Sequence, residues 1–246
     1  QARDRSRVAI ESDAMGAAGL GIPNILCLSG DHHCFGPSPI CKPDQTDMDA
    51  VQVLWMLRRM RDEGIYLDGR SIKQRPRWFL GAAASPFGAP PKYEAIRAEK
   101  KINAGAQFIQ TQPIFDTARF TEWLEALDKR NLLDKVYVLA GLVPLKSAQA
   151  AHFMAETVPG VVIPADILKR MDACGDDKAL QQETGVAIAL ELLEQLMQIP
   201  GINGIHIMAI HWEEIVPRLV VESGLPRPGQ AAGGAELAAA NTLVTA

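Results

Sequence analysis

The chain has 246 residues, of which 48% are hydrophobic, and its formal net charge is −4 with a pI near 5.8. It can bury a substantial core, and α/β barrels of about this length form one domain. The acidic balance argues against a nucleic-acid partner, and no apolar run reaches the roughly 18 residues that a membrane span needs.

Strand-like and helix-like stretches alternate along the chain, which is typical of repeated βα units. In the first half we predict helices over 4–19, from Thr46 and over 93–105, and strands over 24–29, 78–84 and 107–112. Thr46 with Asp49 resembles a capping pair, and Gly105 is typical of a helix C-cap.

In the second half, Asp116 is predicted to cap a helix whose buried side carries Phe120, Trp123, Leu124 and Leu127. Strands are predicted over 136–141 and 205–210, and helices over 147–157, after Pro164, over 178–199 and up to Ser223. Pro217 marks a first turn or a kink. The Ala-, Gly- and Pro-rich residues 226–246 are predicted to be a mobile tail after one domain over 1–225.

These five strands, each followed by a helix, predict an α/β fold of the (β/α)8 TIM-type barrel class, of which the chain supplies about five βα units. A closed barrel needs eight strands, and five alone would expose two parallel edges. The sequence also begins abruptly with a polar helix start, Ala2-Arg3-Asp4-Arg5. We therefore expect that an amino-terminal part of the barrel is missing, through truncation or because another chain supplies it.

The cysteines show no CxxC spacing, and Gln1 opens a polar segment rather than a signal peptide. We expect reduced thiols and a cytoplasmic protein without membrane contact. His32-His33-Cys34 and Cys41 are zinc-ligand types, but their spacing matches no common module, so a substrate or cofactor loop is favoured and no metal is predicted.

Polar groups gather where the predicted strands end, whereas the strand bodies are apolar. The ends are Ser29-Gly30-Asp31, Ala82-Ala83-Ala84-Ser85, Thr111-Gln112-Pro113, Gly141-Leu142-Val143-Pro144 and His211-Trp212-Glu213-Glu214. Because the carboxyl ends of parallel strands meet at one edge, an active site is expected there. By contrast, His206 within a strand is predicted to be a hydrogen-bonded core residue, and Phe115 and Trp212 are predicted to pack in the core.

Four segments resemble the methylenetetrahydrofolate reductase family in order and spacing. They are Leu28-Ser29-Gly30-Asp31, the stretch 104–116 with Thr111-Gln112 and Phe115-Asp116, Ala140-Gly141-Leu142-Val143-Pro144, and Gly204-Ile205-His206-Ile207-Met208. The resemblance runs from about Gln1 to Leu225 and covers the family's barrel from the end of its third strand onward. Its most specific part is the stretch 104–116.

The resemblance implies a flavin-dependent enzyme that reduces 5,10-methylenetetrahydrofolate to 5-methyltetrahydrofolate on a (β/α)8 barrel. It implies FAD rather than FMN, with NAD(P)H or a partner electron carrier as donor. The implied partners are methylenetetrahydrofolate, a redox partner subunit and further copies of the chain in a homo-oligomer.

The same resemblance implies roles for residues at two strand ends. Gly30 and Asp31 match a loop that contacts the flavin, and Asp31 also faces the folate, so it is the predicted catalytic residue. Ser29 stands where the family has Arg and is kept as a cofactor contact. Thr111 and Gln112 match a substrate-binding pair, with Gln112 as a pterin ligand.

Lys101 matches a family Lys that contacts the flavin phosphate, and a backbone stretch beside the flavin is matched by Ala82, Ala83 and Ala84. Ser85 stands where the family commonly has Tyr. Ile210-His211-Trp212 stand where it has Leu-Asn-Arg, so an Arg contact to the folate tail is not expected. The family's general acid is a Glu on the first strand, which is absent from this sequence.

The chemistry of these residue types suits those roles. Small side chains let a flat ring lie close to the backbone, and an amide offers a donor and an acceptor in one plane to a pterin edge. A carboxylate such as Asp31 favours a cationic iminium, and Lys101 complements a phosphate as a point charge.

Two other functions fit the same pattern. One is a pterin or corrinoid methyltransferase barrel without flavin, which the visible absorption spectrum would distinguish. The other is a non-catalytic barrel subunit of a redox complex, which co-purification with a partner would reveal.

Overall fold

The structure is a computed structural model that describes residues 1–31, 46–88 and 90–225. One parallel sheet contains β1 (Asn24–Cys27), β2 (Phe79–Ala84), β3 (Phe108–Pro113), β4 (Tyr137–Leu142) and β5 (Gly204–Ile207), paired in that order. The helices are α1 (Arg7–Gly19), α2 (Ala50–Asp62), α3 (Glu94–Ala104), α4 (Thr117–Asp128), α5 (Ala148–Thr157), α6 (Ala165–Asp172), α7 (Lys178–Met197) and α8 (Val216–Glu222).

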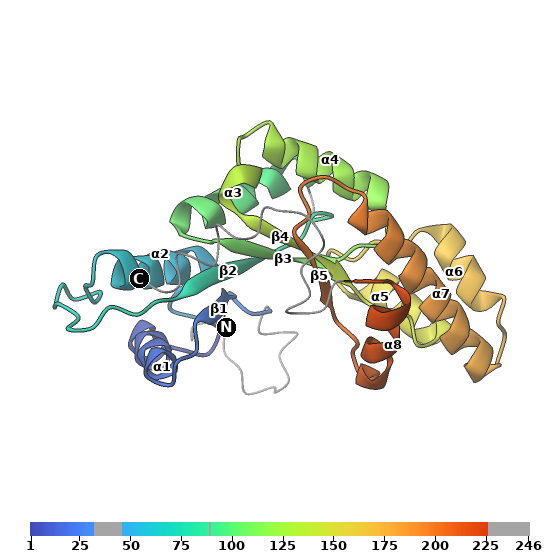
Figure 1. The fold of residues 1–246 in the computed structure, drawn as a ribbon, viewed down its shortest axis with the longest axis horizontal. Coiled ribbons are helices and arrows are strands. Elements are labelled where there is room, and N and C mark those ends of the chain that lie inside the picture. The colour runs from blue at the N-terminus through green and yellow to red at the C-terminus, as the bar shows by residue number, and fades with distance from the viewer. Residues whose placement is uncertain (32–45, 89, 226–246) are drawn as a thin grey trace.

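The strand order identifies the type of α/β fold. Each strand pairs with the next strand along the chain, from β1 to β5. A doubly wound sheet reverses its order at a switch point, whereas a (β/α)8 barrel keeps strictly sequential neighbours. The predicted α/β fold with five βα units is therefore confirmed. Figure 1 shows β1 with α1 at one end of this arrangement and β5 with α8 at the other.

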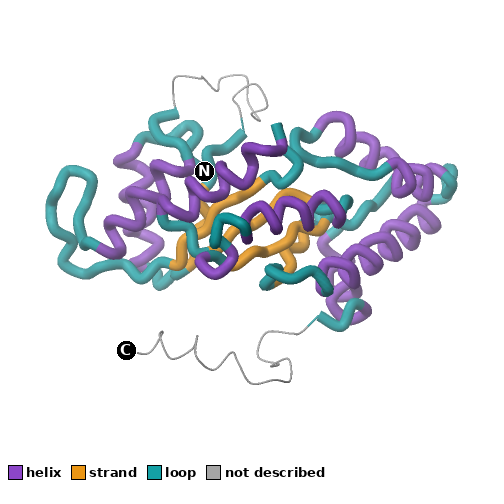
Figure 2. Tube along the Cα trace, turned by 90° about the horizontal axis from the view of Figure 1, so that it is seen from above, coloured by secondary structure: helices purple, strands orange, loops and turns teal. Residues whose placement is uncertain are grey.

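The two faces of the sheet have different surroundings. Alternate strand residues are buried against α2, α3 and α4, and they include Leu80, Ala82, Ile109, Val138 and Ala140. Figure 2 shows helices lying over the strands on this side. The opposite face, which we call the inner face, carries Phe79, Gly81, Ala83, Phe108, Gln110, Tyr137, Leu139, Gly141 and His206, as the pairing register requires.

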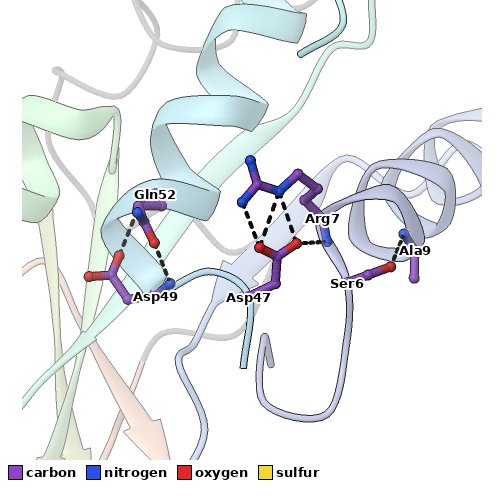
Figure 3. A network of polar contacts seen from close by, with 6 residues as sticks. All are labelled: Ser6, Arg7, Ala9, Asp47, Asp49 and Gln52. Atoms are coloured by element: carbon purple, nitrogen blue, oxygen red, sulfur yellow. Dashed lines mark hydrogen bonds and ion pairs between the residues drawn. The ribbon is translucent and has the colours of Figure 1, made fainter. Parts of the chain in front are cut away.

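Helix α2 begins with a capping box, but not the one that the sequence predicts. The Asp49 carboxylate accepts a hydrogen bond from the Gln52 backbone N–H at 2.8 Å, and the Gln52 side-chain oxygen accepts one from the Asp49 N–H at 2.9 Å (Figure 3). The expected partner Thr46 is wrong, because the reciprocal bond comes from the third helical position. Asp47 instead accepts from the Arg7 backbone N–H at 2.7 Å, at the start of α1.

Other boundaries follow from local backbone geometry. Asp116 caps α4 and Gly105 caps α3 with a φ of +127°, as predicted. Helix α1 begins three residues later than predicted, because Asp4 has a φ of +65°, which is not helical. Strand β5 ends before the predicted residue 210, because the Ile210 N–H bonds to the Met208 carbonyl oxygen.

Two features concern the limits of the described chain. The predicted tail over 226–246 lies outside the described residues, so the single domain over 1–225 stays a prediction. Within the described ranges, no helix combines the length and the apolar character that a bilayer crossing requires.

Candidate active site

The amino-terminal half of the inner face is a floor of aromatic rings. The rings of Phe79 and Phe108 stack with centroids 5.5 Å apart, and the Tyr137 ring lies 6.0 Å from that of Phe79. Phe108 occupies the space above Gly81, where a side chain would clash with its ring. These rings fill the amino-terminal half of the inner face, so we expect a ligand nearer the carboxyl ends of the strands.

The carboxyl-terminal half of the same face carries small and polar side chains. Ala83 on β2 pairs with Gln110 on β3, and Gly141 on β4 pairs with His206 on β5. Gln110 and Gln112 are partly exposed, whereas Thr111 between them is buried. The amide of Gln110 and the imidazole of His206 therefore lie above the aromatic floor, on strands that carry Ala83 and Gly141 beside them.

A β-bulge lies at the predicted substrate-binding pair. Gln110 pairs with Leu139 and Pro113 with Gly141, so β3 advances three residues where β4 advances two. The extra residue falls at Thr111-Gln112. Bulges redirect side chains and are common next to active sites. The sequence motif and the backbone irregularity therefore coincide.

The Thr111 hydroxyl holds the bulge together. Its Oγ1 accepts a hydrogen bond from the Gly141 N–H at 2.9 Å and donates one to the Gln112 carbonyl oxygen at 2.9 Å. The side chain is only 3% exposed. Its position favours a supporting role for Thr111, while direct contact with a substrate stays a prediction.

The Ser29-Gly30-Asp31 segment follows β1 at the same edge of the sheet. The Ser29 hydroxyl accepts from the Ala50 N–H at 2.9 Å, which ties the strand to the start of α2. Gly30 has a φ of +90°, and Arg3 donates to the Asp31 carbonyl oxygen at 2.9 Å. The Asp31 side chain is exposed, and its carboxylate forms no hydrogen bond with the described residues.

Asp31 and Gln112 lie at the carboxyl ends of β1 and β3, on either side of β2. Neighbouring strands are about 4.8 Å apart, so the two strands are separated by about 10 Å. The strand order places both residues at the same edge of the sheet, and their convergence on one ligand stays a prediction.

Lys101 reaches the carboxyl end of β2 from helix α3. Its ammonium donates to the Ala83 carbonyl oxygen at 2.6 Å. Burial lowers the pKa of Lys101, and the carboxylates of Glu94 and Asp49 partly counteract this effect. A partly buried cation at a strand end is suited to an anionic group of a ligand.

The three predicted alanines divide between the two faces. Ala82 and Ala84 are 0% and 8% exposed and pack in the core with the helices. Ala83 lies between them on the inner face. Only Ala83 therefore offers its side chain to a ligand on the inner face, while Ala82 and Ala84 could contribute backbone atoms.

His206 is a candidate that the sequence did not single out as functional. Its Nδ1 is buried and has no hydrogen-bond partner among the described residues, so the predicted hydrogen-bonded core histidine is wrong. Burial also lowers its pKa. A signal was present in the sequence, because His206 is a polar residue in an otherwise apolar strand, one position before the strand's last residue.

Other sequence expectations concern packing and metal binding. Phe115 and Trp212 are 3% and 5% exposed and belong to the core beside α5–α8, as predicted. The histidine and cysteine group at 32–34 and 41 lies outside the described residues. Among the residues that the structure does describe, no cluster of three or more His, Cys, Asp or Glu side chains could hold a metal ion.

Comparisons with known proteins agree with the motifs. The family model of methylenetetrahydrofolate reductase matches residues 1–224. The chain is 24% identical to a probable methylenetetrahydrofolate reductase (NADPH) of Caenorhabditis elegans, over 85% of this chain and 29% of the relative. It is 26% identical to methylenetetrahydrofolate reductase 1 of Schizosaccharomyces pombe, over 83% of this chain and 32% of the relative.

A plant relative and a solved structure are also similar. The chain is 23% identical to methylenetetrahydrofolate reductase (NADH) 1 of Arabidopsis thaliana, over 83% of this chain and 34% of the relative. It thus spans about a third of the length of these relatives. An uncharacterized protein from Clostridium thermocellum that binds two copies of 5-methyl-5,6,7,8-tetrahydrofolic acid matches with a TM-score of 0.47 and 18% identity, over 72% of this chain and 59% of that one.

Proposed function

We propose that this chain, which belongs to the methylenetetrahydrofolate reductase family, forms the folate- and flavin-binding part of an enzyme that reduces 5,10-methylenetetrahydrofolate to 5-methyltetrahydrofolate. The reaction would take place at the carboxyl ends of β1 to β5, above the aromatic floor. Membership of the family supports the reaction class, and the geometry of this chain supports the location.

The β-bulge at Thr111-Gln112 is the observation that carries the proposal. It brings the Gln112 backbone over Gly141, which carries no side chain, and Gln112 is partly exposed at this point. An amide with a donor and an acceptor in one plane can hold the edge of a pterin ring. Gln112 would thus orient the substrate, and Thr111 would fix the backbone that presents Gln112.

The inner face also fits a flavin. Ala83 leaves room for a flat ring close to β2, and Gln110 beside it on the same face is partly exposed. Lys101 supplies a positive charge beside Ala83. A bound flavin would supply the hydride, and FAD is proposed rather than FMN, with NAD(P)H or a partner electron carrier as donor.

Asp31 would act at the reacting end of the substrate. Its exposed carboxylate can stabilise a cationic iminium carbon at the edge of the sheet, which is the form of the substrate that accepts hydride. Arg3 holds the Asp31 backbone carbonyl, so the side chain stays available for this purpose.

The test uses the full-length protein that contains this chain. Purified protein is incubated with FAD or FMN, separated from free flavin, and its visible spectrum recorded. The proposal predicts a bound flavin that methylenetetrahydrofolate reoxidises after reduction by dithionite, NADH or NADPH, with 5-methyltetrahydrofolate as the product.

A Gln112→Leu variant should retain the flavin spectrum and reoxidise about a hundredfold more slowly at low substrate concentration, because it loses two hydrogen bonds to the pterin. Gln198→Leu, which changes an exposed amide at the end of α7, before the amino end of β5, serves as the control. A colourless protein that takes up no added flavin would overturn the proposal.

A further inference from the structure

A cavity of about 440 Å³ lies at the amino-terminal ends of β1 and β2, away from the candidate active site. Its walls are the end of α1, the connection to β1 and the segment before β2. The lining residues are Met15, Ala18, Gly19, Gly21, Ile22, Pro23, Gln74, Arg75, Pro76, Arg77 and Trp78. Because the cavity is at the other end of the strands, a ligand there would not occupy the inner-face site.

The charges at this cavity have one sign. Arg75 and Arg77 line it, and none of the described lining residues is acidic. Between Asp68 and Glu94 the sequence contains no Asp or Glu at all. The basic segment therefore has no carboxylate of its own.

Neither guanidinium is neutralised by a carboxylate among the described residues. Arg75 donates to the backbone carbonyl oxygen of Asp62 at 2.9 Å, which leaves its positive charge uncompensated. Arg77 is exposed and forms no hydrogen bond or ion pair within the described ranges. Charge-assisted hydrogen bonds to an anion are the strongest interactions that such groups can make.

Trp78 contributes apolar surface to the cavity wall. It is 3% exposed, and its ring also belongs to the core that packs against the sheet. Its Nε1 is buried, so a ligand in the cavity would contact the ring and not the N–H.

The remaining walls of the cavity are apolar and favour a ligand with an apolar part. Met15, Ala18, Ile22 and Pro23 give the cavity an apolar side. The last carbonyl groups of α1, which would repel an anion, are capped by the N–H groups of residues 20–22. We propose that this cavity binds an organic anion, with an apolar or aromatic body against α1 and Trp78 and a carboxylate, sulfonate or phosphate group facing Arg75 and Arg77.

The test is a calorimetric titration of the full-length protein with 8-anilinonaphthalene-1-sulfonate, which combines an aromatic body with one sulfonate. The titration is repeated with Lys101→Met, which removes the cation of the proposed inner-face site and leaves the cavity unchanged. We expect one site that both proteins retain. The affinity should fall about tenfold in Arg77→Gln and further in Arg75→Gln/Arg77→Gln.

Two further variants serve as controls. Trp78→Phe keeps an aromatic wall and removes an N–H that is closed off from the cavity, so it should bind like wild type. Arg130→Gln removes an exposed arginine that pairs with Glu99 elsewhere, and it should bind like wild type. The proposal is overturned if the Arg75 and Arg77 variants bind as wild type does, if Arg130→Gln weakens binding equally, or if Lys101→Met abolishes binding.

Discussion

Thr111 and Gly141 together stabilise the β-bulge between β3 and β4. The Gly141 N–H donates to the Thr111 hydroxyl at 2.9 Å, and a Cβ at Gly141 would lie 2.5 Å from the Thr111 carbonyl oxygen. It would also lie 2.8 Å from the Gln112 carbonyl oxygen. The bulge therefore needs a hydroxyl on one strand and the absence of a side chain on the other.

The hydroxyl contribution can be isolated with Thr111→Val, which has nearly the same shape. The substitution leaves the buried Gly141 N–H unpaired, so the free energy of unfolding should fall by about 1–3 kcal/mol. Chemical denaturation measures this change. Thr121→Val is the matched control, because the Thr121 hydroxyl donates to a carbonyl within helix α4 and its loss leaves no N–H unpaired. Equal stability of the two variants would contradict the assignment.

The proposed role of Asp31 predicts a separation between binding and turnover. Asp31→Asn keeps the backbone carbonyl that accepts from Arg3 and removes the negative charge. Reduction of methylenetetrahydrofolate should slow by about a hundredfold, because the cationic carbon loses its counter-charge. Flavin uptake should be unchanged. Asp134→Asn, an exposed control, should leave both intact, and Asp31 is not catalytic if its variant turns over normally.

Replacing Lys101 is expected to lower the affinity for the flavin without lowering the stability of the fold. Lys101→Met removes a cation whose burial is unfavourable, as its lowered pKa indicates, together with one hydrogen bond to Ala83. The free energy of unfolding at neutral pH should stay within about 1 kcal/mol of wild type. Flavin should bind about tenfold more weakly, measured by the quenching of its fluorescence. The exposed neighbour Lys100 provides the control, Lys100→Met.

The same lysine predicts a pH dependence with a definite sign. Between the lowered pKa of Lys101 in the folded protein and the ordinary lysine pKa of 10.5, the unfolded chain binds more protons than the folded chain. Wild-type stability should therefore gain a favourable contribution as the pH rises through this window. Lys101→Met should lack that contribution when the two proteins are compared by denaturation across alkaline pH. Identical pH profiles would show that Lys101 is not buried as described.

The sequence predicts elements better than it predicts the supporting contacts of the site. Strand order, the Asp116 cap and the Gly105 cap follow from signals within a few residues. In contrast, the Ser29 hydroxyl bonds to Ala50, 21 residues away, and Lys101 bonds to Ala83, 18 residues away. A hydroxyl or ammonium has no local signature of a distant partner, so both residues were assigned to a cofactor without their bonds inside the fold.

The bulge and His206 show the same limit. Thr111 bonds to a residue 30 positions away, on another strand. The register shift depends on how two strands pair, which neither strand encodes alone. His206 was interpreted as satisfied because most buried polar groups are, and only its three-dimensional neighbours reveal that Nδ1 is not.

His206 therefore provides the last prediction, a dependence of stability on acid pH. Burial lowers its pKa below the ordinary histidine pKa of 6.5. In the folded protein the ring therefore stays neutral to lower pH than in the unfolded chain. As the pH falls from 6.5 towards the folded-state pKa, the unfolded chain takes up the proton first, and stability is lost. His206→Leu should remove this loss, whereas His152→Gln, at an exposed histidine paired with Asp172, should retain it. Denaturation between pH 7 and pH 5 measures the difference. If His206→Leu loses as much stability on acidification as wild type, the imidazole is not held neutral by burial, and its place on the inner face must be revised.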